Sequence, residues 1–100
     1  MITQFTLTPI GTKSDSLSDI LSKALAPVAA SGLPYKIGPM STSVEGDWNS
    51  IMDLINRCRE ACLKECDRVS IAITVDDRKG AAPNRITGKV QSLETKMKGI

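Results

Sequence analysis

The stretch that determines the fold lies at residues 68–75 and reads Arg68-Val69-Ser70-Ile71-Ala72-Ile73-Thr74-Val75. Branched aliphatic residues occupy every second position, and small or hydroxyl-bearing residues fill the positions between them. This period of two predicts a strand with one apolar face. Polar turn residues follow at 76–80, Asp-Asp-Arg-Lys-Gly, so we expect the strand to end there.

A helix is predicted immediately before this strand. Apolar residues recur every three or four positions, which is the spacing of one helix face; they are Trp48, Ile51, Met52, Ile55, Cys58, Cys62 and Cys66. Asp47 is the expected N-cap, because its side chain can accept a hydrogen bond from a free N–H of the first turn. We expect this stripe to be buried against the sheet.

The N-terminal half repeats the pattern. Alternation predicts a strand over 2–10, and an apolar stripe from Leu17 to Val28 predicts a helix that ends at Gly32. Asp15 and Ser16 are equally good caps for this helix. Two short extended pieces at 35–37 and 42–44, joined around Gly38-Pro39-Met40, predict an antiparallel hairpin.

A last helix is predicted after about Pro83, with an apolar stripe of Ile86, Val90, Leu93 and Met97. The order is then strand, helix, strand, strand, helix, strand, helix. This order is the split βαβ arrangement of ferredoxin-like folds. We therefore predict an α+β fold, ferredoxin-like βαββαβ, with a four-stranded antiparallel sheet plus a C-terminal helix, as a single domain over residues 1–100.

Composition argues against several classes of function. The 13 basic and 11 acidic residues nearly cancel, and Phe5, Tyr35 and Trp48 are the only aromatic residues, so a nucleic-acid surface is not expected. The chain has no histidine, which removes Ser-His and Cys-His nucleophile pairs. We also expect no signal peptide and no membrane association, because no apolar segment is long enough. The cysteine usage favours a reducing cytoplasm.

The predicted sheet leaves one face uncovered, since two helices cover only one side. That open face carries small, half-polar residues: Gln4, Thr6, Thr8, Ser70, Ala72 and Thr74. Such a surface permits close approach by another sheet, although solvent-facing antiparallel sheets are also common. We favour packing between sheets of two copies, with a ligand at or near the junction.

Several short motifs, in order along the chain, resemble those of the thiamine-binding-protein family. The most specific is Gly38-Pro39-Met40-Ser41-Thr42-Ser43-Val44-Glu45-Gly46-Asp47-Trp48. The others are residues 9–12, 16–18, 31–35, 68–70 and 76–78, together with Lys89-Val90. The resemblance covers essentially the whole chain. The cysteine-rich segment at Cys58, Cys62 and Cys66 departs from the pattern we expect.

The resemblance implies a ferredoxin-like fold, association through sheet faces into a homodimer or homotetramer, and no catalytic activity. It also implies a small-molecule ligand, since some relatives bind thiamine or its hydroxymethylpyrimidine part. No cofactor and no metal are implied.

Glu45 and Asp76 are the leading ligand-binding candidates, because carboxylates at strand ends can accept hydrogen bonds from an aminopyrimidine and attract a thiazolium cation. Trp48 is positioned to stack on the ring. A purely structural interpretation stays open: Glu45 and Asp47 would serve the helix N-terminus, Trp48 would lie in the core, and residues 76–78 would form a local turn.

Three further residues complete the predicted ligand site. Ser18 lies at a helix N-terminus, whose N–H groups bind polar ligand atoms, and it matches the family motif. Thr42 can contribute a hydroxyl, and Arg78 follows the carboxylates of the last strand. The three cysteines are interpreted as small buried side chains, because a soft-metal site lacks a fourth ligand.

These observations favour a non-catalytic protein that binds thiamine or its hydroxymethylpyrimidine part as an oligomer. The alternative is a structural or regulatory interaction protein whose sheet face serves assembly alone. An enzyme with Glu45 or Asp76 as base, and Lys89 or Arg78 as electrostatic stabiliser, ranks last because no nucleophile–base pair is recognisable.

Overall fold

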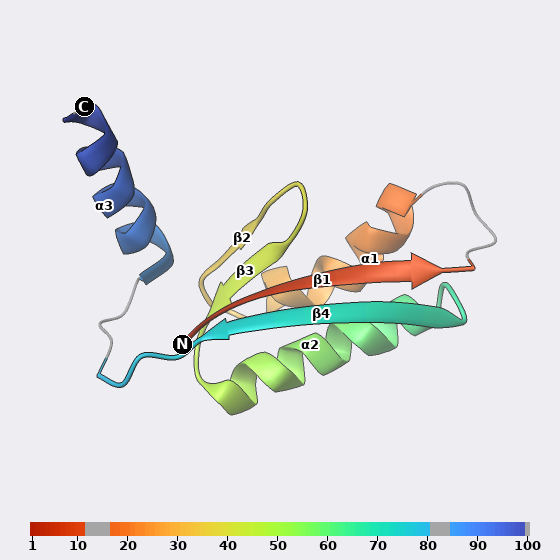
Figure 1. The fold of residues 1–100 in the computed structure, drawn as a ribbon. Helices are drawn as coiled ribbons and strands as arrows, with labels where there is room; N and C mark the ends of the chain where they lie inside the picture. Colours follow the sequence, from red (N-terminus) through yellow and green to blue (C-terminus); the bar gives the residue numbers. More distant parts are fainter. Residues whose placement is uncertain (12–16, 81–84, 100) are drawn as a thin grey trace.

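The structure, a computed structural model, describes residues 1–11, 17–80 and 85–99. Its elements follow in the order β1 (Ile2–Ile10), α1 (Leu17–Ala30), β2 (Tyr35–Ile37), β3 (Thr42–Glu45), α2 (Trp48–Leu63), β4 (Arg68–Asp76) and α3 (Arg85–Lys98). The predicted ferredoxin-like α+β order, with its C-terminal helix, is confirmed (Figure 1).

The four strands form one antiparallel sheet in the order β2-β3-β1-β4. β1 pairs with β4 along its whole length, from Ile2 opposite Asp76 to Ile10 opposite Arg68. β3 pairs only with the first part of β1, from Ile2 opposite Glu45 to Phe5 opposite Thr42. The long β1–β4 ribbon therefore extends past the short β2–β3 hairpin, as Figure 1 shows.

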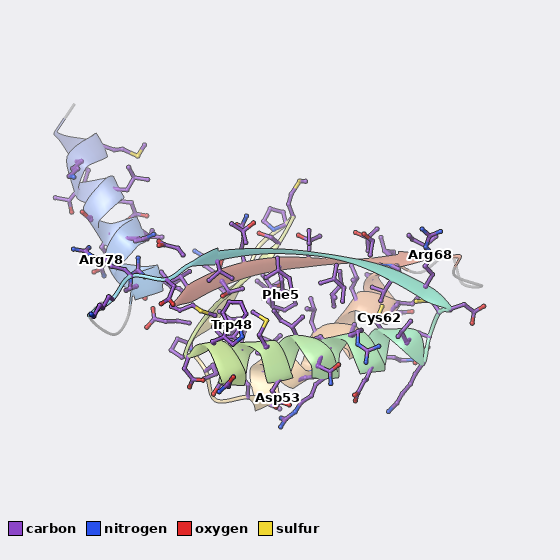
Figure 2. The ribbon with its side chains drawn as sticks, turned by 60° about the horizontal axis from the view of Figure 1, so that its bottom comes forward. Phe5, Trp48, Asp53, Cys62, Arg68 and Arg78 are labelled. Atoms are coloured by element: carbon purple, nitrogen blue, oxygen red, sulfur yellow. The ribbon has the colours of Figure 1, made fainter. Side chains whose placement is uncertain are left out.

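Helices α1 and α2 pack on one face of the sheet, which we call the covered face. Figure 2 shows Phe5 pointing from the sheet toward the helices. The core lies between these layers and combines strand residues with both helices: Phe5, Leu7, Val44, Ile20, Ala24, Val28, Ile51, Leu54, Ile55, Cys58, Cys62 and Cys66. The odd-numbered positions of β1 face this core because side chains alternate along a strand.

The opposite side of the sheet is the open face, and its predicted composition is confirmed. Gln4, Thr8, Ser70, Ala72 and Thr74 are all exposed there. Thr6 is half-buried, and its hydroxyl donates to the carbonyl oxygen of Met40 at 3.1 Å.

The predicted cap of α2 is confirmed. The backbone N–H of Ser50 donates to Asp47 Oδ1 at 2.9 Å, and the Ser50 hydroxyl donates to Asp47 Oδ2 at 2.9 Å. These bonds stabilise the ionised carboxylate and lower the pKa of Asp47. The predicted end of α1 is also found, since Gly32 has a φ of 76° just past the helix. The candidate caps Asp15 and Ser16, like Pro83, lie outside the described residues.

The predicted apolar stripes are too long at their ends. Trp48, placed in the buried stripe of α2, is 56% exposed, and Leu17, the first residue of the stripe of α1, is also exposed. Both residues are the first of their helices. The prediction that Trp48 belongs to the core is therefore wrong.

Helix α3 does not join the core. It projects from one corner of the sheet (Figure 1), and none of its described residues is fully buried. Its apolar stripe is exposed at Val90, Leu93 and Met97. Among the described residues, the helices are too short or too polar to cross a lipid bilayer.

Candidate functional site

The two predicted carboxylates lie at one corner of the sheet. Glu45 is the last residue of β3 and Asp76 is the last residue of β4, and both pair with Ile2 of the central strand β1. Residues directly opposite one another on antiparallel strands project from the same face. Glu45 and Asp76 therefore flank Ile2 on the open face, and we call this pair the acidic corner.

The N-terminal turn of α3 lies against the acidic corner. The backbone N–H of Ile86 donates to Glu45 Oε1 at 3.1 Å. Arg85 donates to Asp76 Oδ2 at 2.9 Å and to the Asp76 carbonyl oxygen at 3.4 Å. Lys89 Nζ forms an ion pair with the same Asp76 Oδ2. The two carboxylates thus anchor a helix that has no buried side chain of its own.

The two carboxylates differ in their surroundings. Glu45 is buried, with 8% of its surface exposed, whereas the side chain of Asp76 is 50% exposed. The hydrogen bond from Lys89 lowers the pKa of Asp76, and the positive charges of Arg85 and Lys89 act in the same direction, while partial desolvation opposes them. Asp76 is therefore an anion at neutral pH, suited to hold a cation.

Thr42 and Trp48 lie away from the acidic corner. Thr42 pairs with Phe5 and is buried on the covered face, so its side chain projects from the face opposite to Glu45. Figure 2 shows Trp48 on the side of the sheet where α2 lies. The structure thus places both residues on the other face of the sheet from the two carboxylates.

Ser18 and Arg78 lie at opposite ends of the molecule. Ser18 is exposed in the first turn of α1, which follows the end of β1 remote from the acidic corner. Arg78 is exposed two residues after Asp76, and Figure 2 shows it beside the start of α3. Of the six predicted site residues, the structure brings Glu45, Asp76 and Arg78 to one region.

Sequence reasoning missed Arg85 and the backbone of Ile86 as partners of the carboxylates. Lys89 entered the sequence analysis as part of the family motif and as an electrostatic group in an enzyme, and not as a partner of Asp76. The contacts join residues nine or more positions apart in the chain, and every residue except proline has a backbone N–H, so the sequence does not identify which N–H will bind a carboxylate. The basic residues at 85 and 89 share a helix face by their i, i+4 spacing, which is the one signal that was available.

Thr42 instead lines a surface cleft of about 270 Å³ between the β2–β3 hairpin and α1. Apolar side chains dominate its lining, among them Phe5, Leu21, Leu25, Ile37 and Met40. The cleft offers mainly hydrophobic contact, and its lining includes no charged side chain. It does not supply the charge that a cationic ligand requires.

The cysteines behave as buried side chains. Cys58 and Cys62 have no exposed surface and Cys66 has 8%. Within the described ranges, no three histidine, cysteine, aspartate or glutamate side chains are grouped closely enough to hold a metal ion.

The pattern of the family described as thiamine-binding protein matches residues 3–94. The protein MT1949 of Mycobacterium tuberculosis, named only as a UPF0045 protein, is 35% identical over 95 residues, which cover 94% of this chain and 91% of the relative. The UPF0045 protein YqgV of Bacillus subtilis is 31% identical over 104 residues, covering 99% and 92%.

Solved structures show the same fold. The protein MJ1052 of Methanocaldococcus jannaschii superposes with a TM-score of 0.81 at 25% identity, over 93% of this chain and 94% of the other. The protein TM0486 of Thermotoga maritima, whose name links it to thiamine biosynthesis or salvage, gives a TM-score of 0.75 at 20% identity, over 89% and 96%. On the match of residues 3–94 and the identity to full-length relatives, this chain belongs to the thiamine-binding protein family.

Proposed function

We propose that this protein is a non-catalytic binder of thiamine or its hydroxymethylpyrimidine part, and that the acidic corner is its ligand site. The observation that carries the proposal is the placement of Glu45 and Asp76 on either side of Ile2, on one face and at one end of the sheet. The family name supports the class of ligand. We further propose that the protein binds this ligand as an oligomer.

The chemistry of the corner suits this ligand. Thiamine joins an aminopyrimidine, which donates hydrogen bonds, to a thiazolium ring with a permanent positive charge. A carboxylate accepts hydrogen bonds and attracts a cation. Buried Glu45 is suited to accept from the amino group, and half-exposed Asp76 is suited to face the cation.

Binding at this corner competes with α3. Arg85 and Lys89 already neutralise Asp76, so an incoming thiazolium has to displace at least one of these side chains or share the carboxylate with it. Hydroxymethylpyrimidine has no permanent charge and depends less on Asp76. The proposal therefore predicts different sensitivities of the two ligands to substitution at Asp76.

Isothermal titration calorimetry with thiamine and with hydroxymethylpyrimidine tests the proposal. We expect saturable binding that weakens at least fivefold for both ligands in Glu45→Gln, and more for thiamine than for hydroxymethylpyrimidine in Asp76→Asn. Asp53→Asn is the matched control, since Asp53 is an exposed acid that pairs with Arg57 on α2. The proposal is contradicted if neither ligand binds with a dissociation constant of about 10 μM or lower, which corresponds to a binding free energy of roughly −7 kcal/mol.

We propose assembly as the second function, because two surfaces favour self-association. The open face of β1 and β4 carries small side chains, and α3, which projects from a corner of the sheet, exposes Val90, Leu93 and Met97. A homodimer or homotetramer would bury both surfaces. Sedimentation velocity distinguishes these states from a monomer of 10.7 kDa, and Leu93→Glu should shift the distribution toward smaller species. An interface with a dissociation constant on the order of 10 μM would be largely formed at a protein concentration of about 50–100 μM. A wild-type protein that is monomeric at this concentration contradicts the proposal.

A further inference from the structure

Two cysteines approach each other at the end of α2, far from the acidic corner. The sulfur atoms of Cys62 and Cys66 lie 3.8 Å apart. Cys62 belongs to the last turn of the helix, and Cys66 lies in the turn that leads to β4. The Cys66 thiol donates toward the carbonyl oxygens of Cys62 and Arg68, each at 3.3 Å. The two thiols are therefore neighbours with defined orientations.

The backbone between the two cysteines suits a covalent link. The N–H of Cys66 donates to the carbonyl oxygen of Cys62 at 3.2 Å, so the chain continues the helical turn between them. Four residues of helical rise separate their Cα atoms by about 6 Å. Disulfides in proteins span Cα separations of roughly 4.4–6.8 Å. A bond between the two sulfurs thus requires side-chain rotation and little movement of the backbone.

Cys66 is the more accessible residue of the pair. Cys66 contributes to a surface cleft of about 170 Å³, which is also lined by Gly11, Leu63, Lys64, Glu65 and Asp67. Cys66 is 8% exposed, whereas Cys62 and Cys58 have no exposed surface. Because Cys66 is the more exposed residue, we expect it to react with the oxidant first. Cys62 then reacts with the oxidised Cys66 to form the disulfide.

We propose that Cys62 and Cys66 form a reversible intramolecular disulfide when the protein meets a peroxide. The Cys66 thiolate attacks one oxygen of hydrogen peroxide, the O–O bond breaks, and a sulfenic acid forms with loss of hydroxide, which leaves as water after protonation. The Cys62 sulfur then attacks the sulfur of the Cys66 sulfenic acid. The S–S bond forms, the S–O bond breaks, and the sulfenic oxygen leaves as a second water molecule with the proton of the Cys62 thiol. In total, two thiols and one hydrogen peroxide give one disulfide and two water molecules.

Cys58 provides an internal comparison. It lies one helical turn before Cys62 and is fully buried, and burial raises the pKa of its thiol to about 11. A thiol with so high a pKa carries little thiolate at neutral pH and reacts slowly. The pKa of Cys62 is likewise raised to about 11 by burial and by its contact with Cys66, so the pKa does not separate Cys62 from Cys58. Cys62 is distinguished by its sulfur, which lies 3.8 Å from that of Cys66.

Oxidation changes the hydrogen bonds at this end of the molecule. In the thiol form, Cys66 donates toward Cys62 and Arg68, where β4 begins. A disulfide has no S–H, so both donations end and the turn is held by the covalent link instead. The modification therefore acts on the junction of α2 and β4, at the opposite end of β4 from Asp76.

Peptide mapping under non-reducing conditions tests the proposal directly. Trypsin cuts after Arg57, Arg59, Lys64 and Arg68, which places each cysteine in a separate peptide: 58–59, 60–64 and 65–68. After treatment with hydrogen peroxide and alkylation of the remaining thiols, we expect peptides 60–64 and 65–68 to be joined, with alkylated Cys58. Dithiothreitol should separate the joined peptides.

Three variants complete the test. Cys58→Ser should form the same cross-linked peptide as the wild type, whereas Cys62→Ser and Cys66→Ser should form none. The wild-type map stands even if a variant fails to fold. A cross-link that involves Cys58, a link between two copies of the chain, or oxidation of Cys66 to sulfinic acid without a cross-link would overturn the proposal.

Discussion

The backbone N–H of Ile86 donates to the Glu45 carboxylate at 3.1 Å and joins residues 41 positions apart in the chain. Through this bond, the end of β3 holds the start of α3 on the open face of the sheet. Asp76 holds the same turn through Arg85 and Lys89. Since α3 has no buried residue, these polar contacts determine where the helix lies.

Replacing Glu45 should release the first turn of α3. A hydrogen bond to a charged acceptor contributes about 1.5–3 kcal/mol, so Glu45→Ala should lower the free energy of unfolding by an amount in this range. Glu45→Gln keeps an oxygen acceptor and should lose less. Urea denaturation gives the stability, and amide hydrogen exchange at residues 86–90 reports the release. Unchanged exchange there in Glu45→Ala would show that α3 is held by other contacts.

The anchoring of α3 should weaken in acid. The pKa of Asp76 is lowered in the folded protein, so its ionisation stabilises the fold above the unfolded value of about 3.9, and this contribution disappears as the pH falls through the folded value. The difference in thermal midpoint between wild type and Asp76→Asn should be largest at pH 5–7 and shrink below about pH 4. A difference that grows on acidification contradicts this assignment.

The sequence predicted what depends on local pattern. The strand at 68–75, the cap at Asp47 and the assignment of strand faces are found in the structure, because each follows from periods of two or 3.6 residues, although Ile73 is 43% exposed on the covered face. Trp48 failed for the opposite reason. Its spacing fits the buried stripe of α2, but whether a helix end is covered depends on the extent of the neighbouring layer, which local pattern does not contain.

The candidate site was predictable only in part. Glu45 and Asp76 could be placed together, because the order of elements puts both strand ends beside the start of β1. The attachment of α3 was not predictable, since the Ile86 contact uses a backbone group and the Arg85 contact joins residues nine positions apart in the chain. Thr42 illustrates the remaining difficulty, because it lies three positions from Glu45 and therefore projects from the other face.

Removing the Thr3 hydroxyl should stabilise the protein. Thr3 is fully buried on the covered face, and its Oγ1 has no hydrogen-bond partner among the residues that the structure describes. A buried polar group without a partner costs about 1–3 kcal/mol, and valine has nearly the same shape. Thr3→Val should therefore raise the free energy of unfolding by about 1 kcal/mol or more. Chemical denaturation with an unchanged m-value is the measurement.

Thr6→Val is the matched control for this prediction. Thr6 lies on the same strand, but its hydroxyl donates to the Met40 carbonyl oxygen at 3.1 Å. Loss of that bond should lower the free energy of unfolding by about 0.5–1.5 kcal/mol. If both substitutions destabilise the protein, the Thr3 hydroxyl has a partner in solution, such as a buried water.

Trp48 and Ile51 both fit the predicted buried stripe of α2, but they differ in exposure and should differ in their contribution to stability. Ile51 and Trp48 lie three residues apart on the stripe of α2, but Ile51 has no exposed surface and Trp48 is 56% exposed. Ile51→Ala should therefore cost about 2–5 kcal/mol, through lost burial and the cavity that remains. Trp48→Ala should cost less than about 1 kcal/mol, as is usual for surface substitutions. Urea denaturation measures both free energies of unfolding. If Trp48→Ala lowers the free energy of unfolding as much as Ile51→Ala does, the indole is buried in solution, for example at an interface between copies of the chain, and Trp48 is not an exposed residue.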